Sequence, residues 1–208
     1  MSAFQAIVLA LLQGVTELFP VSSLGHSVVI PGLLGWRIDQ SAPTFLAFLT
    51  LLHVGTATAL VVYFRQEWWA IAFDDGRTDL ARLTLRQAVG IGASQVLAFL
   101  PGISRSGSSI TAGLLAGLRH ESAARFSFLL ATPAIAAAGL LEVPRLFDAA
   151  ARPYLGLFLI AAVLSGIAAY LSVAYLMRYF RGGRLDPFAL YCAAFGLAAF
   201  VLLTMLHR

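Results

Sequence analysis

Hydrophobic residues fill four long stretches of this chain that contain no Asp, Glu, Lys or Arg. Residues 40–64, 153–177 and 187–206 are long runs, and residues 126–141 form a shorter run that can be extended at its N-terminal end. A helix needs about 20 mostly apolar residues to cross the hydrocarbon core of a bilayer. We therefore predict four full transmembrane helices, one in each stretch.

Two other apolar regions, residues 3–35 and 87–118, are interrupted in the middle by polar residues. Irregular backbone at membrane depth is tolerated only where it is buried in protein or lines a wet cavity. We predict two re-entrant hairpins, each with two short helices and a polar turn; the alternative is two full spans with polar kinks in each region. The interrupting residues are Gln13, Thr16, Glu17, Pro20, Ser22, Ser23 and His26 in the first region, and Gln95, Pro101, Gly102, Ser104, Arg105, Ser106, Ser108 and Ser109 in the second.

The two interrupted regions align with each other at a constant shift of 81 residues. Pro20 then falls on Pro101 and Ser23 on Ser104, and the apolar run that follows each region matches without a gap. A hairpin returns to its own side of the membrane, whereas a span changes side. The second unit would therefore be inserted upside down, and inverted repeats place a site near the midplane.

These patterns predict an all-α integral membrane protein with an inverted-topology repeat, two re-entrant helical hairpins and about four full transmembrane helices. We expect one membrane domain, residues 1–208. Repeat unit one would cover about 3–65 and unit two about 86–142, followed by C-terminal spans at about 153–177 and 187–206.

Composition supports a membrane protein and excludes a nucleic-acid binder. The chain is 60% hydrophobic and 12% charged, whereas soluble domains are about 25% charged. All 14 basic residues are Arg, and they are spread over short connections between apolar stretches. The single cysteine, Cys192, excludes an internal disulfide and a cysteine-based metal cluster. We read the uncharged N-terminal stretch as part of the mature protein, because it lacks the basic region of a signal peptide.

The arginines sort unequally between the two sides of the predicted topology. Positive residues are enriched in cytoplasmic loops, so the richer side is predicted to be cytoplasmic, with both termini and the mouth of the first hairpin outside. The richer side holds Arg65, Arg77, Arg82, Arg86, Arg119, Arg125, Arg178, Arg181 and Arg184, and the other holds Arg37, Arg145, Arg152 and Arg208.

Glu17 and the remaining arginine, Arg105, are predicted to lie at membrane depth, one in each hairpin. A charge there costs about 2.5–3.5 kcal/mol on insertion scales and usually marks function, although an ion pair that only locks the hairpins together is the alternative. Gln13 lies four residues before Glu17 on the same helix face. The pair could bind a hard cation or orient a neighbouring group, while Gln13 alone could simply join helices.

His26 follows a serine pair in the first polar turn. An imidazole can carry a proton or attack phosphorus, or can be a hydrogen-bonded structural residue. Ser22 and Ser23 could contact a substrate or cap a helix. His53 lies in the middle of the first full span, where we interpret it as a packing or supporting residue.

Residues 101–109 form the most specific run in the chain. Gly102 and Gly107 let the backbone approach a ligand closely, and the serines supply hydroxyl groups. A helix that starts here would present free N–H groups to an anion, and the planar Arg105 fork matches phosphate oxygens. Because this cradle would face a carboxylate, a histidine and serines inside a membrane, we expect a phosphorylated lipid as the ligand.

Together these motifs resemble the undecaprenyl-pyrophosphate phosphatase family, also called the bacitracin-resistance family. The family pattern is [EQ]-x-x-x-E, then S-S-x-G-H, and later P-G-x-S-R-S-x-x-T. The resemblance covers roughly residues 5–140, and more loosely the C-terminal spans. It is carried by residues 13–17, 19–26, 95–98, 101–107 and 125–130 with Pro133.

The resemblance implies a phosphatase of the bacterial inner membrane that hydrolyses undecaprenyl, or another polyprenyl, pyrophosphate to the monophosphate and inorganic phosphate. Such an enzyme recycles the lipid carrier of the cell wall and protects against bacitracin, and its site faces the periplasm. The resemblance also implies a divalent cation, Mg²⁺ or Ca²⁺, for which Glu17 and Gln13 would be the ligands.

By position in the motifs, Glu17 would assist catalysis, and His26 or Ser23 would be the nucleophile or proton carrier. Arg105 would clamp the pyrophosphate. Further substrate contacts are expected from the turn residues Ser22, Gly102, Ser104, Ser106 and Ser109.

The sequence departs from the family in three places. Gln13 stands where Glu is frequent, Ser109 stands where Thr is usual, and residues 65–86 replace two further spans. The alternatives to the enzyme are a transporter of the polyprenyl phosphate and a non-catalytic lipid binder. The Gly113-x-x-x-Gly117 spacing leaves pairing of two copies open.

Overall fold

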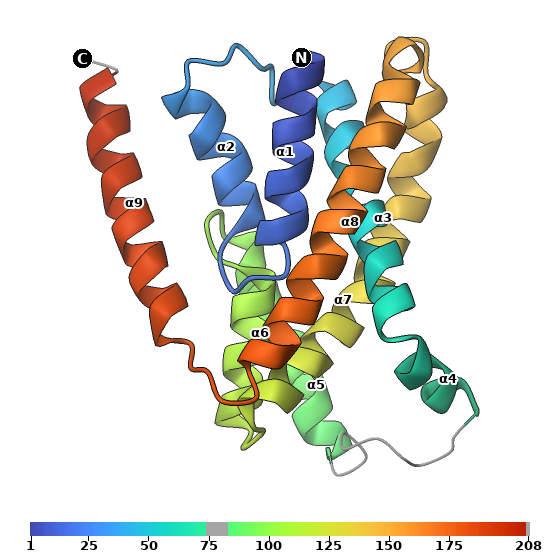
Figure 1. Cartoon of the computed structure of the whole chain (residues 1–208), viewed down its shortest axis with the longest axis vertical. Coiled ribbons are helices and arrows are strands. Elements are labelled where there is room, and N and C mark those ends of the chain that lie inside the picture. Colours follow the sequence, from blue (N-terminus) through green and yellow to red (C-terminus); the bar gives the residue numbers. More distant parts are fainter. Residues whose placement is uncertain (74–82, 207–208) are drawn as a thin grey trace.

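The computed structural model describes residues 1–73 and 83–206, and these residues are helical apart from turns and connections (Figure 1). The all-helical prediction is confirmed. The α-helices are α1 (Ala3–Thr16), α2 (Ser23–Leu33), α3 (Pro43–Tyr63), α4 (Arg65–Phe73), α5 (Leu85–Ala93), α6 (Arg105–Leu115), α7 (His120–Glu142), α8 (Leu155–Tyr179) and α9 (Asp186–Leu206). Short 3-10 helices are η2 (Ser94–Phe99), η3 (Val143–Phe147) and η4 (Arg152–Tyr154).

Among the described residues, three helical segments are long and apolar enough to cross a membrane. They are Pro43–Tyr63, Arg152–Tyr179 and Asp186–Met205. The fourth predicted span corresponds to α7, which has 23 residues. Its first two turns carry His120, Glu121 and Arg125, so its N-terminal end is more polar than the three segments.

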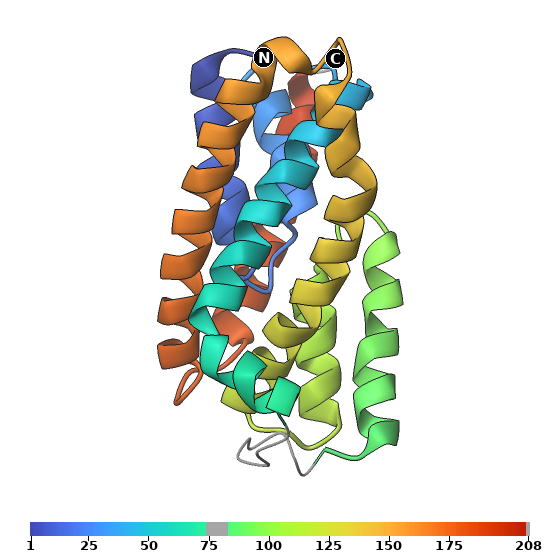
Figure 2. The ribbon, with the colours of Figure 1, turned by 90° about the vertical axis from the view of Figure 1, so that its right-hand side faces the viewer.

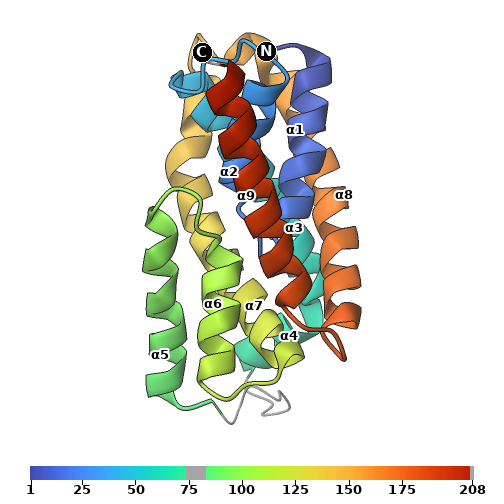
Figure 3. The same ribbon diagram turned by 90° about the vertical axis from the view of Figure 1, so that its left-hand side faces the viewer.

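The helices differ in how far they run along the molecule (Figures 1 and 2). The long helices α3, α7 and α8 extend over most of its length. Helix α1 starts at the end where both termini lie and stops near the middle, and α2 returns to that end. In the same way, α5 runs from the opposite end toward the middle, and α6 returns to that opposite end (Figure 3). The turns after α1 and before α6 therefore lie close together in the middle.

Helices α1 and α3 pack closely against α8 through glycines. A Cβ atom on Gly14 would collide with the backbone oxygen of Ser165, and one on Gly55 would collide with that of Ala162. Small residues of this kind let membrane helices approach until their backbones touch. This close packing against α8 fixes the position of the end of α1, and with it Glu17, relative to α3 and α8.

The second helix of each hairpin is capped by a serine. The Ser22 hydroxyl accepts the Gly25 N–H at 3.1 Å, and the Ser104 hydroxyl accepts the Gly107 N–H at 3.1 Å. Both helices have 11 residues. The two capping serines, Ser22 and Ser104, are 82 residues apart, whereas the repeat alignment has a shift of 81. The difference arises because the turn from Pro101 to Ser104 is one residue longer than the turn from Pro20 to Ser22.

Apart from Arg105, the described arginines collect at two ends of the molecule. The elements with Arg37, Arg145 and Arg152 lie at the end of the termini (Figure 1). The helix ends and connections at the opposite end carry Arg65, Arg86, Arg119, Arg125, Arg178, Arg181 and Arg184. Arg77, Arg82 and Arg208 lie outside the described residues.

The two glycines of the predicted pairing motif have roles within the chain. A Cβ on Gly113 would lie 2.9 Å from the Ala123 Cβ, so this glycine lets α6 approach α7. Gly117 follows the end of α6 with φ +91°, a conformation that favours glycine. Pairing of two copies stays a prediction.

Candidate active site

Glu17 is the centre of a buried polar cluster that joins four helices. It caps the C-terminus of α1 and is 8% exposed. Arg105 Nη2, at the start of α6, donates to Glu17 Oε1 at 2.8 Å. The Ser23 hydroxyl, at the start of α2, donates to Oε2 at 2.6 Å, and His53 Nε2 of α3 lies 3.2 Å from the same oxygen. The two predicted intramembrane charges therefore form an ion pair.

His53 is the residue whose place in the site the sequence did not identify. Its Nδ1 contacts the Leu49 carbonyl oxygen at 2.7 Å, while Nε2 contacts the Glu17 carboxylate. His53 and Arg105 therefore flank the Glu17 carboxyl group from two other helices.

Two helix N-termini reach the same region from opposite directions. Helices α2 and α6 both begin in the middle of the molecule and run away toward opposite ends (Figures 1 and 3). The first N–H groups of a helix have no acceptor within it and bind anions. The Ser106 hydroxyl ties the turns together by donating to the backbone oxygens of Phe19 at 3.0 Å and Glu17 at 3.3 Å.

A small cavity of about 60 Å³ lies between the two turns. It is lined from the first hairpin by Glu17, Val21, Ser22, Ser23 and Leu24, and from the second by Ala98, Gly102, Ile103, Ser104 and Arg105. We call it the turn cavity. It combines one carboxylate, one guanidinium and three hydroxyl groups, which are the groups needed to bind and attack a phosphate.

His26 faces α9. Its Nδ1–H donates to the Ser22 carbonyl oxygen at 2.5 Å, and its Nε2 lies 2.6 Å from the Tyr191 hydroxyl. The ring also stacks on Phe195, with centroids 4.3 Å apart. Tyr191 and Phe195 lie four residues apart on one face of α9, and that spacing is the only signal the sequence offered for them.

Gln13 is turned toward α3 and α8. Its Oε1 accepts hydrogen bonds from Ser165 at 2.5 Å and Thr56 at 3.2 Å, and its buried Nε2 has no partner among the described residues. The amide oxygen that was predicted to bind a cation is therefore occupied by hydroxyl donors. Its role as a metal ligand stays a prediction.

The remaining predicted substrate contacts are Ser109, Gly102, Ser104 and Ser106. Ser109 donates to the Arg105 carbonyl oxygen at 2.9 Å and lies 2.6 Å from the Ser127 hydroxyl, so it joins α6 to α7. Gly102 adopts φ +93° in the turn, which L-residues rarely adopt. Ser104 and Ser106 lie with their hydroxyls 3.1 Å apart, beside Arg105.

The described residues contain no group of three or more His, Cys, Asp or Glu side chains that could hold a metal ion by themselves. Glu17 is the one carboxylate in the turn cavity. One carboxylate is a donor of the kind that Mg²⁺ takes from proteins when water completes its coordination shell; the divalent cation stays a prediction.

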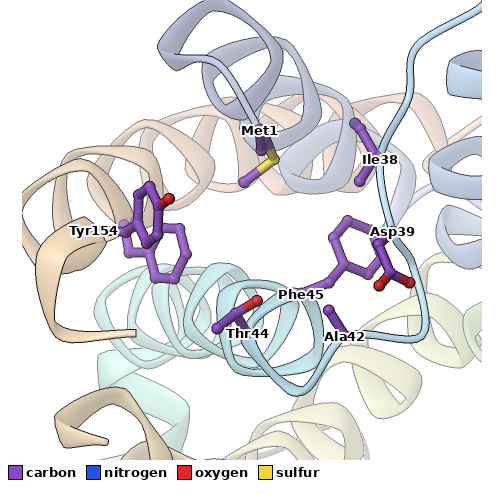
Figure 4. A pocket seen from close by; sticks show the side chains of 8 residues that line it. Met1, Ile38, Asp39, Ala42, Thr44, Phe45 and Tyr154 are labelled. Carbon is purple, nitrogen blue, oxygen red and sulfur yellow. The ribbon is translucent and has the colours of Figure 1, made fainter. Parts of the chain in front are cut away.

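A separate hollow of about 140 Å³ opens at the end where the termini lie (Figure 4). Met1, Ile38, Asp39, Thr44, Phe45 and Tyr154 surround it. Hydrogen bonds from Ser41 lower the pKa of Asp39, so this carboxylate stays charged near neutral pH. No described Arg or His side chain lines the hollow, so it lacks the guanidinium of the turn cavity.

Comparison with known proteins gives consistent results. The sequence model of the family described as "Bacitracin resistance protein BacA" matches residues 6–78 and 72–198. "Undecaprenyl-diphosphatase" of Acidiphilium cryptum (strain JF-5) is 43% identical over 98% of this chain and 99% of its own length. The protein of that name from Granulibacter bethesdensis is 39% identical over 96% of each chain, and "Undecaprenyl-diphosphatase 2" of Burkholderia thailandensis is 43% identical over 95% of each.

These relatives contain an internal segment that this chain lacks. The Acidiphilium alignment has 278 positions and this chain has 208 residues, so at least 70 positions face gaps in this chain. The two family matches overlap at residues 72–78, and we therefore infer that the missing segment falls near this overlap, between α4 and α5. Both hairpins and the helices that support them lie outside it.

Proposed function

The chain belongs to the bacitracin resistance protein BacA family, and from this membership we propose that it hydrolyses undecaprenyl pyrophosphate to undecaprenyl phosphate and inorganic phosphate. One observation supports the chemistry most directly. Glu17, Ser23 and Arg105 meet within hydrogen-bond distance between two helix N-termini. The fold brings these residues together from α1, α2 and α6, and the arrangement suits phosphoryl transfer, which depends on positioning and charge neutralisation.

Arg105 would bind the pyrophosphate. A guanidinium has five N–H donors, and the contact with Glu17 places one nitrogen, Nη2, on the carboxylate. The remaining donors can reach phosphate oxygens, together with the N–H groups at the starts of α2 and α6. Glu17 thus fixes the orientation of Arg105 before substrate arrives, which lowers the cost of ordering the site.

Ser23 would attack the terminal phosphorus. Its hydroxyl already donates to Glu17, so the proton can pass to this carboxylate as the new P–O bond forms. The phosphoanhydride bond breaks, and undecaprenyl phosphate leaves with the bonding electrons. Glu17 passes the proton from Ser23 to the departing undecaprenyl phosphate. It then accepts a proton from the water that attacks the phosphoserine, and returns it to the Ser23 oxygen as the bond between that oxygen and phosphorus breaks and inorganic phosphate leaves.

We also propose a divalent cation that arrives with the substrate. Glu17 would be its protein ligand, and when bound the cation would neutralise part of the pyrophosphate charge. Gln13 would contribute indirectly, by fixing the end of α1 through Thr56 and Ser165.

The membrane arrangement we propose follows the two hairpins. They would enter the bilayer from opposite faces and meet at its middle, as in an inverted repeat. The arginine-rich end would face the cytoplasm. Both termini and the first hairpin would then open toward the periplasm.

The first prediction tests the activity itself. Purified protein in lipid nanodiscs is expected to release inorganic phosphate from undecaprenyl pyrophosphate in proportion to enzyme concentration. The measurement is phosphate release with undecaprenyl phosphate quantified in the same sample. Movement of lipid phosphate across vesicles, or lipid binding, without any phosphate release would contradict the enzyme and favour a transporter or a lipid binder.

A second prediction concerns Tyr191, which we assign as a positioning residue. Only 6% of the most apolar stretch of α9 is buried. The contacts of Tyr191 and Phe195 with His26 hold this helix beside the site. Tyr191→Phe keeps the ring but removes the hydrogen bond, which is worth about 0.5–1.5 kcal/mol. We expect KM for undecaprenyl pyrophosphate to rise about three- to tenfold with kcat within twofold.

The measurement is a separate determination of kcat and KM for Tyr191→Phe and for the control Tyr170→Phe on α8. A fall in kcat at unchanged KM would contradict the positioning role. It would instead place His26 in the chemical step, as the family resemblance allows.

A further inference from the structure

A groove leads away from the turn cavity between the α5–α6 hairpin and α9. It encloses about 470 Å³ and shares four lining residues with the turn cavity: Ser22, Gly102, Ile103 and Ser104. The two spaces are therefore adjacent at the second turn. No described helix lies between them, because the residues that separate them belong to the two polar turns.

One face of α6 forms the floor of this groove. Gly107, Thr111 and Leu115 repeat every four residues along it and so lie on one side of the helix. From Gly107 to Leu115 the floor is about 12 Å long at 1.5 Å per residue. It begins next to Arg105 and ends at the far end of α6.

The polarity of the groove changes along this floor. Ser104 and Ser108 line the end next to the turn cavity, whereas Ala112 and Leu115 line the far end of the floor, and Leu97, Ser94 and Thr111 also line the groove. Leu115 is 85% exposed and Leu97 is 54% exposed, so this part faces the surroundings of the helices. A polar start and an apolar end match an amphiphile with a phosphorylated head.

The opposite wall of the groove is α9. Cys192 of this helix lines the groove, directly after Tyr191, which contacts His26. Helix α9 also packs through Phe188 on Phe19 and Tyr179 and approaches Gly32 of α2 through Leu203, but most of its length is exposed. The groove is consequently open along its side, in the direction from which a membrane lipid would enter.

Another apolar groove, of about 620 Å³, lies between α3 and α7. Val54, Ala57, Thr132 and Ala136 are among its lining residues, and it has no lining residue in common with the turn cavity. Although larger, it is not continuous with the phosphate-binding groups, so it does not fit the tail of a substrate that is bound there.

We propose that the groove between α6 and α9 binds the first isoprene units of the polyprenyl chain while the pyrophosphate occupies the turn cavity. This inference rests on the proposed function for the identity of the lipid. It assigns chain recognition to Thr111, Ala112 and Leu115 on one wall and to α9 on the other. The rest of the chain would extend sideways into the bilayer.

The single cysteine of the chain provides a direct test. Cys192 is exposed and lines the groove, so a maleimide can report on its occupancy in the native protein. The rate of labelling is measured in nanodiscs with a non-hydrolysable undecaprenyl methylenebisphosphonate, with inorganic pyrophosphate, or with phospholipid alone. We expect the undecaprenyl analogue to slow labelling at least fivefold and pyrophosphate to leave it within twofold.

Equal labelling in all three samples, at analogue concentrations that inhibit phosphate release, would overturn the groove assignment and leave the phosphatase activity intact. Protection of Cys192 in a protein that releases no phosphate would instead overturn the proposed function and keep the groove as a lipid site. Protection by pyrophosphate alone would also contradict the groove, because the head would then reach Cys192.

A variant gives a second measurement. Ala112→Phe narrows the floor of the groove and is expected to lower kcat/KM for undecaprenyl pyrophosphate about tenfold, while kcat/KM for isopentenyl pyrophosphate stays within twofold. Val163→Phe, on an exposed face of α8, is the matched control. Equal losses for the long and the short substrate would contradict recognition of the chain by this groove.

Discussion

Replacing Ser23 with alanine is expected to lower kcat for undecaprenyl pyrophosphate by on the order of 10³-fold or more, a loss in the range found when a serine nucleophile is removed. The hydroxyl lies 2.6 Å from the Glu17 carboxylate, so the variant loses the attacking oxygen and the proton path together. Arg105 keeps its contact with Glu17, and KM should therefore change less than tenfold. The measurement is steady-state phosphate release by the parent and the variant.

Ser27→Ala is the matched control, because Ser27 is a buried serine one turn further along α2. It is expected to keep kcat within threefold. A phosphorylated Ser23 peptide recovered by acid quenching of the parent would support the covalent route. If Ser23→Ala retains a tenth or more of the parental kcat, Ser23 is not the nucleophile, and direct attack by water or by His26 must take its place.

Replacing Arg105 with alanine is expected to lower kcat/KM by about 10³-fold, at the low end of the effect of an arginine that neutralises a transferring phosphoryl group. The variant loses the phosphate clamp, and it also leaves the buried Glu17 carboxylate with one cation fewer, which weakens anion binding further. Arg105→Lys should recover only part of the loss, since an ammonium cannot match phosphate oxygens with a planar fork.

Two measurements separate binding from folding for this residue. Binding of the undecaprenyl methylenebisphosphonate is measured by isothermal titration, and the thermal unfolding midpoint is measured in the same nanodiscs. Arg37→Ala, in the connection between α2 and α3, is the control and should keep both values. Wild-type affinity for the analogue in Arg105→Ala would contradict the clamp, and the ion pair would then serve only to lock the hairpins together.

The missing segment between α4 and α5 bears on how much of the family architecture this activity requires. At least 70 positions of the Acidiphilium protein have no counterpart here. Nevertheless α1, α2, α3 and α6 bring Glu17, Ser23, His53 and Arg105 together. The two hairpins line the turn cavity. Helix α3 adds His53 beside Glu17, and α8 holds α1 and α3 in place through the close contacts at Gly14 and Gly55.

Local sequence was sufficient for the helices and for the choice of candidate residues. The apolar runs fixed where α3, α8 and α9 lie, because a stretch of about 20 apolar residues forms a helix that satisfies its own backbone in lipid. Two isolated charges in apolar surroundings identified Glu17 and Arg105, since such charges are costly without a function. The motif spacing also indicated the family, which the comparisons show.

Tertiary structure alone decided which of these residues meet. His53 lies 36 residues after Glu17, and nothing in its apolar surroundings distinguishes it from a packing residue until α3 crosses the end of α1. Gln13 was expected beside Glu17, yet hydroxyl groups from α3 and α8 take its oxygen. Periodicity places a side chain on a face of its own helix, but it does not say which helix that face meets.

The same limit applies to His26 and the groove. The sequence determined a membrane-embedded helical protein with one acidic and one basic centre, because hydrophobicity and charge are local properties of the chain. Only the packing of α9 decided that His26 contacts Tyr191 and Phe195 and that Cys192 lines a path from the phosphate site. These contacts join residues more than 160 positions apart, and their partners are selected by shape and hydrogen bonding in three dimensions.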